Sequence, residues 1–322
     1  MQSQDLAPAN AGLELKFLWL ELTRKCNLEC VHCYTDSSPA RDLYETLGAD
    51  DWKRALREAA TLDCRSVQFI GGEPTLHPEL PDLIDLARDL GFEFIEVYTN
   101  GVSIGPRLKK HLVDNSVALA FSVYANAAAA HDAVTRRAGS FERTLKSIRW
   151  ALDAGLDVRC GVIATPANAA ATLFAERFLR ELGIGDIRVD VQRPVGRGQS
   201  EETCDALDGL CGHCADGRLC VTASGALHPC VFSRFAEVGR ASEGLAVAVA
   251  GLSMGLFRDA IQERLRKPRA FAQCVPFGDP CSPEEGHPCA PLGGRRCIPE
   301  GGECSPNVPP CNPEGACSPS TR

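Results

Sequence analysis

Two hydrophobic patterns recur along the chain. Short runs rich in β-branched and aromatic residues are typical of strands, and longer segments place apolar residues three and four positions apart, as amphipathic helices do. Several of the helical segments end on glycine, which is a common helix terminator. The predicted strands are 16–22, 66–70, 92–99, 117–124, 157–164 and 186–192, and the predicted helices between them include 49–62, 79–91, 141–155 and 173–183.

Strand–helix repetition of this kind predicts an α/β fold with parallel strands joined by right-handed crossovers. Six units are too few for a closed eight-stranded barrel, so a six-stranded partial barrel and a doubly wound sheet remain as alternatives. In both folds, ligand sites lie at the carboxyl ends of the strands. Unusual residues follow the predicted strands at these ends: a cysteine loop at 25–36, "GGEP" at 71–74, "TNG" at 99–101, Ser122 and Tyr124, "ATPAN" at 164–168 and "RPVGRG" at 193–198.

The loop "KCNLECVHCYTD" places Cys26, Cys30 and Cys33 in a C-x3-C-x2-C pattern. A structural zinc site closes with four ligands, and an iron–sulfur cubane also normally takes four cysteines. A site with three thiolates has one coordination position for a ligand that is not protein. The loop therefore predicts an iron–sulfur cluster that binds a small molecule.

Composition limits the remaining classes of function. The 322 residues are 44% hydrophobic, enough for a full core, and the net charge of −8 argues against a broad nucleic-acid-binding surface. No apolar run is long enough to span a bilayer, and residues 1–15 form a polar lead without the features of a signal peptide. Seventeen cysteines in a chain without an export signal favour metal binding in a reducing cytoplasm over a disulfide framework.

The three-cysteine loop after a first strand, with Gly-Gly-Glu-Pro after the second, resembles the radical S-adenosylmethionine (radical SAM) superfamily. The resemblance covers about residues 16–198, with weaker signals to about 272. It implies a partial (β/α)6 barrel of the radical SAM type, a [4Fe–4S] cluster held by the three cysteines, and SAM on the open iron. The residues that it places around SAM are His32, Gly71, Gly72, Glu73, Thr99, Asn100, Ser122 and Arg136 or Arg137.

A second cysteine group follows the barrel. "CGHCADGRLCVTASGALHPC" (211–230) predicts a cysteine pair, a β-hairpin that turns at Ser224-Gly225, and a final cysteine. It resembles the opening of the SPASM/Twitch extensions of radical SAM enzymes, which hold auxiliary iron–sulfur clusters. The resemblance implies one or two auxiliary [4Fe–4S] clusters, with Cys211, Cys214 and Cys230 as ligands, Cys274 as the fourth, and Cys281 and Cys289 as further candidates.

The C-terminal segment departs from that family pattern. Its cysteines, from 274 to 317, are spaced 7, 8, 8, 7, 7 and 6 residues apart among Pro, Gly, Glu and Asn. Such a composition cannot bury an apolar core, so we expect an irregular segment that is tied down by metal or disulfides. The predicted divisions are a lead (1–15), a radical SAM barrel (16–198), a SPASM-like extension with a β-hairpin and helix (199–272) and a Cys/Pro-rich segment (273–322).

The resemblance implies reductive cleavage of SAM to a 5′-deoxyadenosyl radical that takes hydrogen from a substrate. A ribosomally made precursor peptide is the favoured substrate, because SPASM-bearing relatives mostly modify peptides. A flavodoxin- or ferredoxin-type electron donor and a separate leader-peptide-binding protein are the expected partners, with no nucleic acid or membrane.

Two alternatives stay open. One is a radical SAM enzyme that acts on a small molecule in cofactor, sugar or natural-product biosynthesis. The other is a non-enzymatic scaffold in which zinc is held by Cys30 and Cys33 with Cys211 and Cys214, an interpretation that leaves "GGEP" unexplained.

Overall fold

The structure is a computed structural model, and it describes residues 14–40, 45–165, 168–199 and 206–266. Six parallel strands follow one another in chain order across the sheet, each inside one of the predicted runs. The predicted partial barrel is therefore confirmed. The strands are β1 (Phe17–Glu21), β2 (Ser66–Ile70), β3 (Phe94–Thr99), β4 (Ala118–Ser122), β5 (Val158–Ala164) and β6 (Asp186–Val191).

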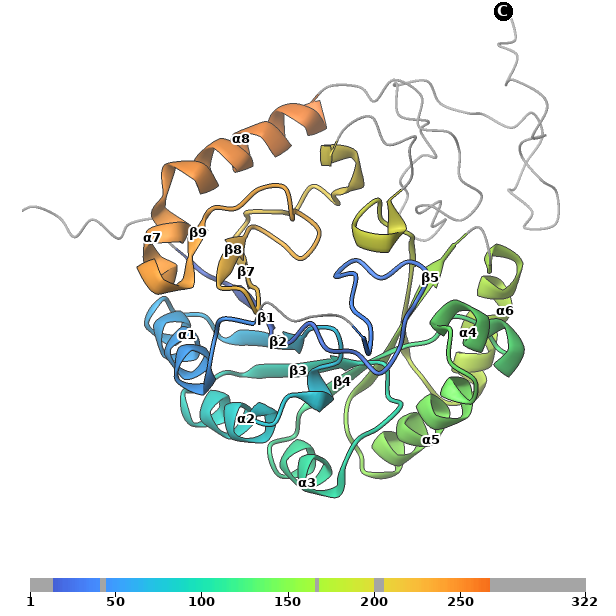
Figure 1. The fold of residues 1–322 in the computed structure, drawn as a ribbon. Coiled ribbons are helices and arrows are strands. Elements are labelled where there is room, and N and C mark those ends of the chain that lie inside the picture. Colours follow the sequence, from blue (N-terminus) through green and yellow to red (C-terminus); the bar gives the residue numbers. More distant parts are fainter. Residues whose placement is uncertain (1–13, 41–44, 166–167, 200–205, 267–322) are drawn as a thin grey trace, which may run out of the picture. The chain divides into compact units, whose positions relative to one another are not determined.

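Helices connect these strands on the outer side of the sheet (Figure 1). Four of them lie where the sequence predicts, whereas α3 and α4, which are nine and eight residues long, are not predicted. The helices are α1 (Ala49–Thr61), α2 (Leu80–Asp89), α3 (Pro106–Asp114), α4 (Ala128–Thr135), α5 (Ser140–Asp153) and α6 (Ala169–Glu181), with 3-10 turns at Pro74–Leu76 and Gly196–Gly198.

The two faces of the sheet differ in polarity, because successive side chains of a strand point to opposite sides. The outer face packs against the helices with fully buried apolar side chains, such as Leu20, Phe69 and Phe121. Cys64 and Cys160 also lie in this core. The inner face instead carries polar and charged groups, of which Glu21, Gln68 and Glu96 are buried and Tyr98, Ser122 and Arg159 are half-buried.

The extension continues the barrel sheet. β7 (Arg218–Val221) pairs in parallel with β1, and β8 (Ala226–His228) and β9 (Gly239–Arg240) add antiparallel strands. The predicted hairpin is confirmed, with Gly225 at φ 78° in its turn. The pairing of β7 with β1 is not foreseen by the sequence patterns. Helices α7 (Leu245–Ala250) and α8 (Leu252–Arg266) and the turns Ala206–Gly209 and Ala241–Glu243 complete the described extension.

Candidate functional site

The cysteine loop follows β1 and is held by the segment that follows β2. The backbone amides of Gly72 and Glu73 donate to the carbonyl oxygens of Thr23 and Lys25, at 2.7 Å each. A Cβ on Gly72 would lie 2.2 Å from the Lys25 carbonyl oxygen, and one on Gly71 would lie 2.7 Å from that of Thr23. Both positions require glycine, because the backbone of the cysteine loop passes so close.

Glu73 joins the ends of β2 and β3. Its buried carboxylate accepts hydrogen bonds from the Thr99 hydroxyl at 2.6 Å, the Asn100 amide at 2.8 Å and the Thr75 amide at 3.1 Å. Burial raises the pKa of this carboxyl group, and these three donors act against the shift. The predicted residues of the second and third strand ends thus form one hydrogen-bonded unit beside the cysteine loop.

The three thiols of the loop lie close enough to affect one another. Burial raises the pKa of the Cys26 thiol well above its usual range, and Glu73, Cys30 and Cys33 raise it further. Burial also raises the pKa of Cys30 to about 12, with a contribution from Cys33. Iron is ligated by thiolate and not by thiol, so assembly of a cluster here would release protons.

Polar groups surround two of the sulfur atoms. The Cys33 sulfur accepts from the Ser37 amide at 3.3 Å and lies 3.2 Å from the Thr35 hydroxyl. The Cys26 sulfur accepts from the Leu28 amide at 3.4 Å and from the Asn100 side chain at 3.7 Å. Hydrogen bonds to sulfur are one of the factors that set the reduction potential of an iron–sulfur cluster.

The loop after β6 closes over the cysteine loop from the other edge of the barrel. The Arg197 guanidinium donates to the carbonyl oxygens of Cys30 and Ser37, at 2.8 and 2.7 Å, and pairs with Asp36 at 2.9 Å. Its backbone amide donates to the Cys33 carbonyl at 2.9 Å. "RPVGRG" stands out in the sequence as unusual, but only the fold reveals that Arg197 fixes the cysteine loop.

His32 carries a buried polar atom without a partner. Within the described residues, its Nδ1 makes no hydrogen bond, and its ring packs edge-on against Tyr124 at a centroid distance of 4.9 Å. Burial, and then the nearby Arg197, lower its pKa to about 4, so the imidazole is neutral at pH 7. An unpaired nitrogen beside an aromatic ring suits the predicted position next to adenine. The Ser122 hydroxyl interacts with Tyr98 and Tyr124 on the same inner face.

The structure separates the two arginines that the sequence leaves as alternatives. Arg136 ends α4 in the left-handed region, at φ 55°, and its side chain is exposed. Arg137 reaches the cysteine loop and donates to the Asn27 carbonyl oxygen. The geometry thus favours Arg137 as the arginine near the site.

The cysteines of the extension form a second group. The sulfur atoms of Cys214 and Cys230 lie 3.2 Å apart, longer than a disulfide bond, and Cys211 hydrogen-bonds to Cys214. These hydrogen bonds of Cys214 raise its own pKa and lower the pKa of Cys211 to about 5 and that of Cys230 to about 7. Cys220 is buried in β7. The other predicted ligands, Cys274, Cys281 and Cys289, lie outside the described residues.

The donors in both groups are cysteine thiols, which suit zinc and iron–sulfur clusters alike. Over the described ranges, no three or more His, Cys, Asp or Glu side chains are grouped so that they could hold one ion. A cubane binds each cysteine at a different iron atom, so its ligands surround the cluster and do not converge on one point. Nothing in the described geometry supports the zinc alternative, which needs Cys30 and Cys33 beside Cys211 and Cys214. The same residues include no helix that is long and apolar enough to cross a membrane.

Comparison with known protein families shows that residues 20–166 match the Radical SAM superfamily. A probable GTP 3′,8-cyclase of Saccharolobus islandicus is 26% identical over 189 residues, which are 58% of this chain and 60% of that protein. The antilisterial bacteriocin subtilosin biosynthesis protein AlbA of Bacillus subtilis is 28% identical over 184 residues, or 56% of this chain and 40% of AlbA. The matches thus span 60% or less of these relatives' lengths.

Among solved structures, Streptococcus suis SuiB bound to S-adenosylmethionine has a similar fold. It superposes with a TM-score of 0.63 at 18% identity, over 76% of this chain and 68% of SuiB. The similarity extends beyond the matched family region, which ends at residue 166.

Proposed function

Because residues 20–166 belong to the radical SAM superfamily, we propose that the protein is a radical SAM enzyme that modifies a ribosomally made peptide. The observation that carries the proposal is the unit formed by the three-cysteine loop and the Gly72–Glu73 segment that holds it. When bound, a [4Fe–4S] cluster with SAM on its open iron supplies a 5′-deoxyadenosyl radical that takes hydrogen from the substrate.

The chain's own residues bind and orient the cluster and SAM. Cys26, Cys30 and Cys33 hold the cluster, and Asn100, Thr35 and the Ser37 amide hydrogen-bond to its thiolates. His32 offers its unpaired nitrogen to adenine, and the other polar groups predicted around SAM orient it from the neighbouring strand ends. The loop after β6, which Arg197 holds against the cysteine loop, excludes water from that side of the site.

A peptide is the favoured substrate because the fold resembles SuiB over the extension as well as the barrel. SuiB has a structure with its precursor peptide SuiA, and AlbA takes part in the biosynthesis of a bacteriocin. A small-molecule substrate is the second candidate, since the similarity to GTP 3′,8-cyclases covers a comparable share of the chain.

The extension is proposed to hold an auxiliary cluster through Cys211, Cys214 and Cys230. Their mutual contacts support this proposal, and Cys274 remains the first candidate for a fourth ligand. A flavodoxin- or ferredoxin-type protein is the proposed electron donor, and a separate leader-binding protein the proposed partner for a peptide substrate.

The function is tested with anaerobically reconstituted protein, dithionite and SAM. The wild type should produce 5′-deoxyadenosine, and the triple variant with Cys26, Cys30 and Cys33 changed to Ala should not, while it keeps auxiliary iron. Formation of 5′-deoxyadenosine by the triple variant would contradict the assignment of the loop. Faster formation with a precursor peptide encoded beside the gene supports the peptide substrate, and no effect of that peptide speaks against it.

A further inference from the structure

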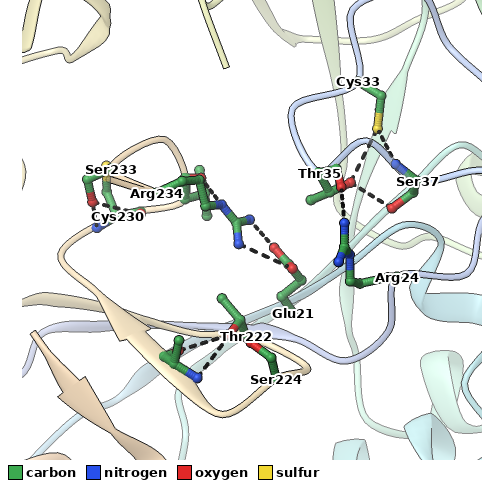
Figure 2. A network of polar contacts seen from close by, with 12 residues as sticks. Glu21, Arg24, Cys33, Thr35, Ser37, Thr222, Ser224, Cys230, Ser233 and Arg234 are labelled. Atoms are coloured by element: carbon green, nitrogen blue, oxygen red, sulfur yellow. Dashed lines mark hydrogen bonds and ion pairs between the residues drawn. The ribbon is translucent and has the colours of Figure 1, made fainter. Parts of the chain in front are cut away.

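A cavity lies between the two cysteine groups. It has a volume of about 300 Å³ and is bounded by the segment after Cys33, the turn after β6 and the hairpin of the extension. In Figure 2, Cys33 and Cys230 lie on opposite sides of the Glu21–Arg234 pair, which forms part of the cavity wall. The polar side chains of the wall include Glu21, Arg24, Tyr34, Asp36, Ser224 and Arg234.

Most charged side chains of the cavity wall already form ion pairs with one another or with neighbouring residues. The Glu21 carboxylate binds both terminal nitrogens of Arg234, whose guanidinium also lies over the Tyr34 ring at 5.4 Å. Asp36 pairs with Arg197. Because each carboxylate of the wall already has an arginine partner, neither leaves an uncompensated negative charge in the cavity.

Arg24 is the exception. Its guanidinium donates to the Thr35 carbonyl at 3.3 Å, and no carboxylate in the described part of the chain forms an ion pair with it (Figure 2). Glu45 binds only the backbone amide of Arg24, at 2.9 Å, and the Thr23 hydroxyl. Four of the five N–H donors of this guanidinium therefore make no hydrogen bond to the described residues.

A second donor group lies on the same wall. Among the described residues, none forms a hydrogen bond with the Tyr34 hydroxyl, and Tyr34 follows Cys33 directly. A guanidinium with free N–H donors matches the geometry of a carboxylate, which accepts two parallel hydrogen bonds from arginine.

We propose that this cavity binds a carboxylate of the peptide substrate, with Arg24 as the residue that recognises it. The inference rests on the proposed peptide-modifying function and adds the chemistry by which the substrate is held. A cavity of about 300 Å³ is at the lower end for ligand sites, so it fits one acidic side chain or a chain terminus. Such an anchor would place the adjoining residue of the peptide between the two cysteine groups.

The proposal is tested by ligand-observed NMR titration of the reconstituted full chain with three capped tripeptides. Ac-Gly-Glu-Gly-NH2 carries a side-chain carboxylate, Ac-Gly-Gly-Gly-OH carries a terminal one, and Ac-Gly-Gln-Gly-NH2 carries neither. At low salt, at least one of the carboxylate peptides should bind about tenfold more tightly than the glutamine peptide. The tighter of the two identifies the source of the carboxylate, and either result upholds the site.

Variants show whether Arg24 is responsible. Arg24→Gln should abolish the preference, whereas Arg24→Lys, which keeps the charge, should retain part of it. Arg107→Gln removes an exposed arginine of α3 that pairs with Asp82, so it serves as the control for net charge and should leave the preference intact. If Arg24→Gln does not fold, loss of the wild-type preference at high salt and its partial retention in Arg24→Lys decide the question.

Three outcomes would overturn the proposal. They are equal affinity for charged and neutral peptides, a preference that survives in Arg24→Gln, and displacement of the peptide by SAM, which would assign the cavity to the methionine carboxylate. None of these measurements requires SAM cleavage, so failure of this inference is distinct from failure to form 5′-deoxyadenosine.

Discussion

At the scale of single residues, Gly72 shows how closely the cysteine loop is packed. A methyl group at this position would lie 2.2 Å from the Lys25 carbonyl oxygen, so Gly72→Ala must displace the start of the loop. We expect a loss of about 1–3 kcal/mol in the free energy of unfolding, and less iron retained after reconstitution. Denaturant unfolding and iron analysis measure the two effects.

Gly185 is a matched control for that substitution. It is exposed in the loop before β6, its φ is outside the left-handed region, and a Cβ there would meet nothing within 4 Å. Gly185→Ala should therefore leave stability and iron content close to those of the wild type. Equal losses of stability and iron in the two variants would contradict the explanation that the close passage of the Lys25 carbonyl requires glycine at position 72.

His131 gives a pH dependence that is independent of any metal. It is buried, and its Nδ1 accepts from the Tyr124 amide at 3.3 Å. Burial lowers its pKa to about 4, although Asp132 acts in the opposite direction. A histidine with a lowered pKa contributes stability above its unfolded pKa of about 6.5, and this contribution is lost as the pH falls toward 4.

The variant His131→Gln isolates this contribution, because glutamine does not titrate. The difference in unfolding free energy between wild type and variant should shrink by up to about 3 kcal/mol between pH 6.5 and pH 4. Urea denaturation at a series of pH values measures it. A difference that stays constant with pH would show that His131 is not held neutral by burial.

Some residues of the site can be predicted from sequence, and others cannot, for a physical reason. Cys26, Cys30, Cys33 and Glu73 belong to short motifs at the ends of strands, where parallel folds place their ligands. Arg197 contacts partners about 160 positions earlier in the chain, and Arg24 stands out only because the folded chain gives it no carboxylate partner among the described residues. No local pattern carries such information.

At the scale of elements, the loop after β6 holds the cysteine loop in place through Arg197. Arg197→Met keeps much of the aliphatic stem but removes the ion pair with Asp36 and two hydrogen bonds to carbonyl oxygens. We expect the free energy of local opening of the cysteine loop to fall by roughly 2–4 kcal/mol. Amide hydrogen exchange of residues 28–37 should be faster than in the wild type.

Arg188→Met is the matched control on β6. Arg188 is exposed and pairs with the nearby Asp186, so its loss should not change exchange in the cysteine loop. Unchanged protection of residues 28–37 in the Arg197 variant would mean that the loop is held by its contacts with Gly72 and Glu73 alone.

The strands of the barrel could be predicted because each lies in a short run rich in β-branched, aromatic or other apolar residues, whereas the position of β7 could not. β7 is four residues long and its pattern fits a hairpin with β8, which forms. Its second, parallel pairing with β1 joins segments about 200 residues apart, and no period in the sequence encodes that contact.

At the scale of the whole described region, the barrel and the extension share one sheet of nine strands. β1 therefore lies inside the sheet, between β2 and β7, and its backbone is paired on both sides. On the outer face, Leu18 and Leu20 are opposite Leu219 and Val221, and all four are buried in one core. The extension thus completes the barrel's core as well as carrying the second cysteine group.

A chain truncated after Gly198 should consequently fail to fold into a stable barrel. The truncation leaves β1 with an unpaired edge and exposes its apolar neighbours to water, and both effects favour aggregation. A chain truncated after Arg266 keeps every described element and should remain soluble, with a cooperative thermal transition near that of the full chain. Soluble yield, circular dichroism and size-exclusion chromatography of the two truncated chains compare them. A monomeric shorter chain with wild-type stability would instead mean that the barrel folds alone, as the predicted boundary at 198 implies, and that β7 docks on a finished edge.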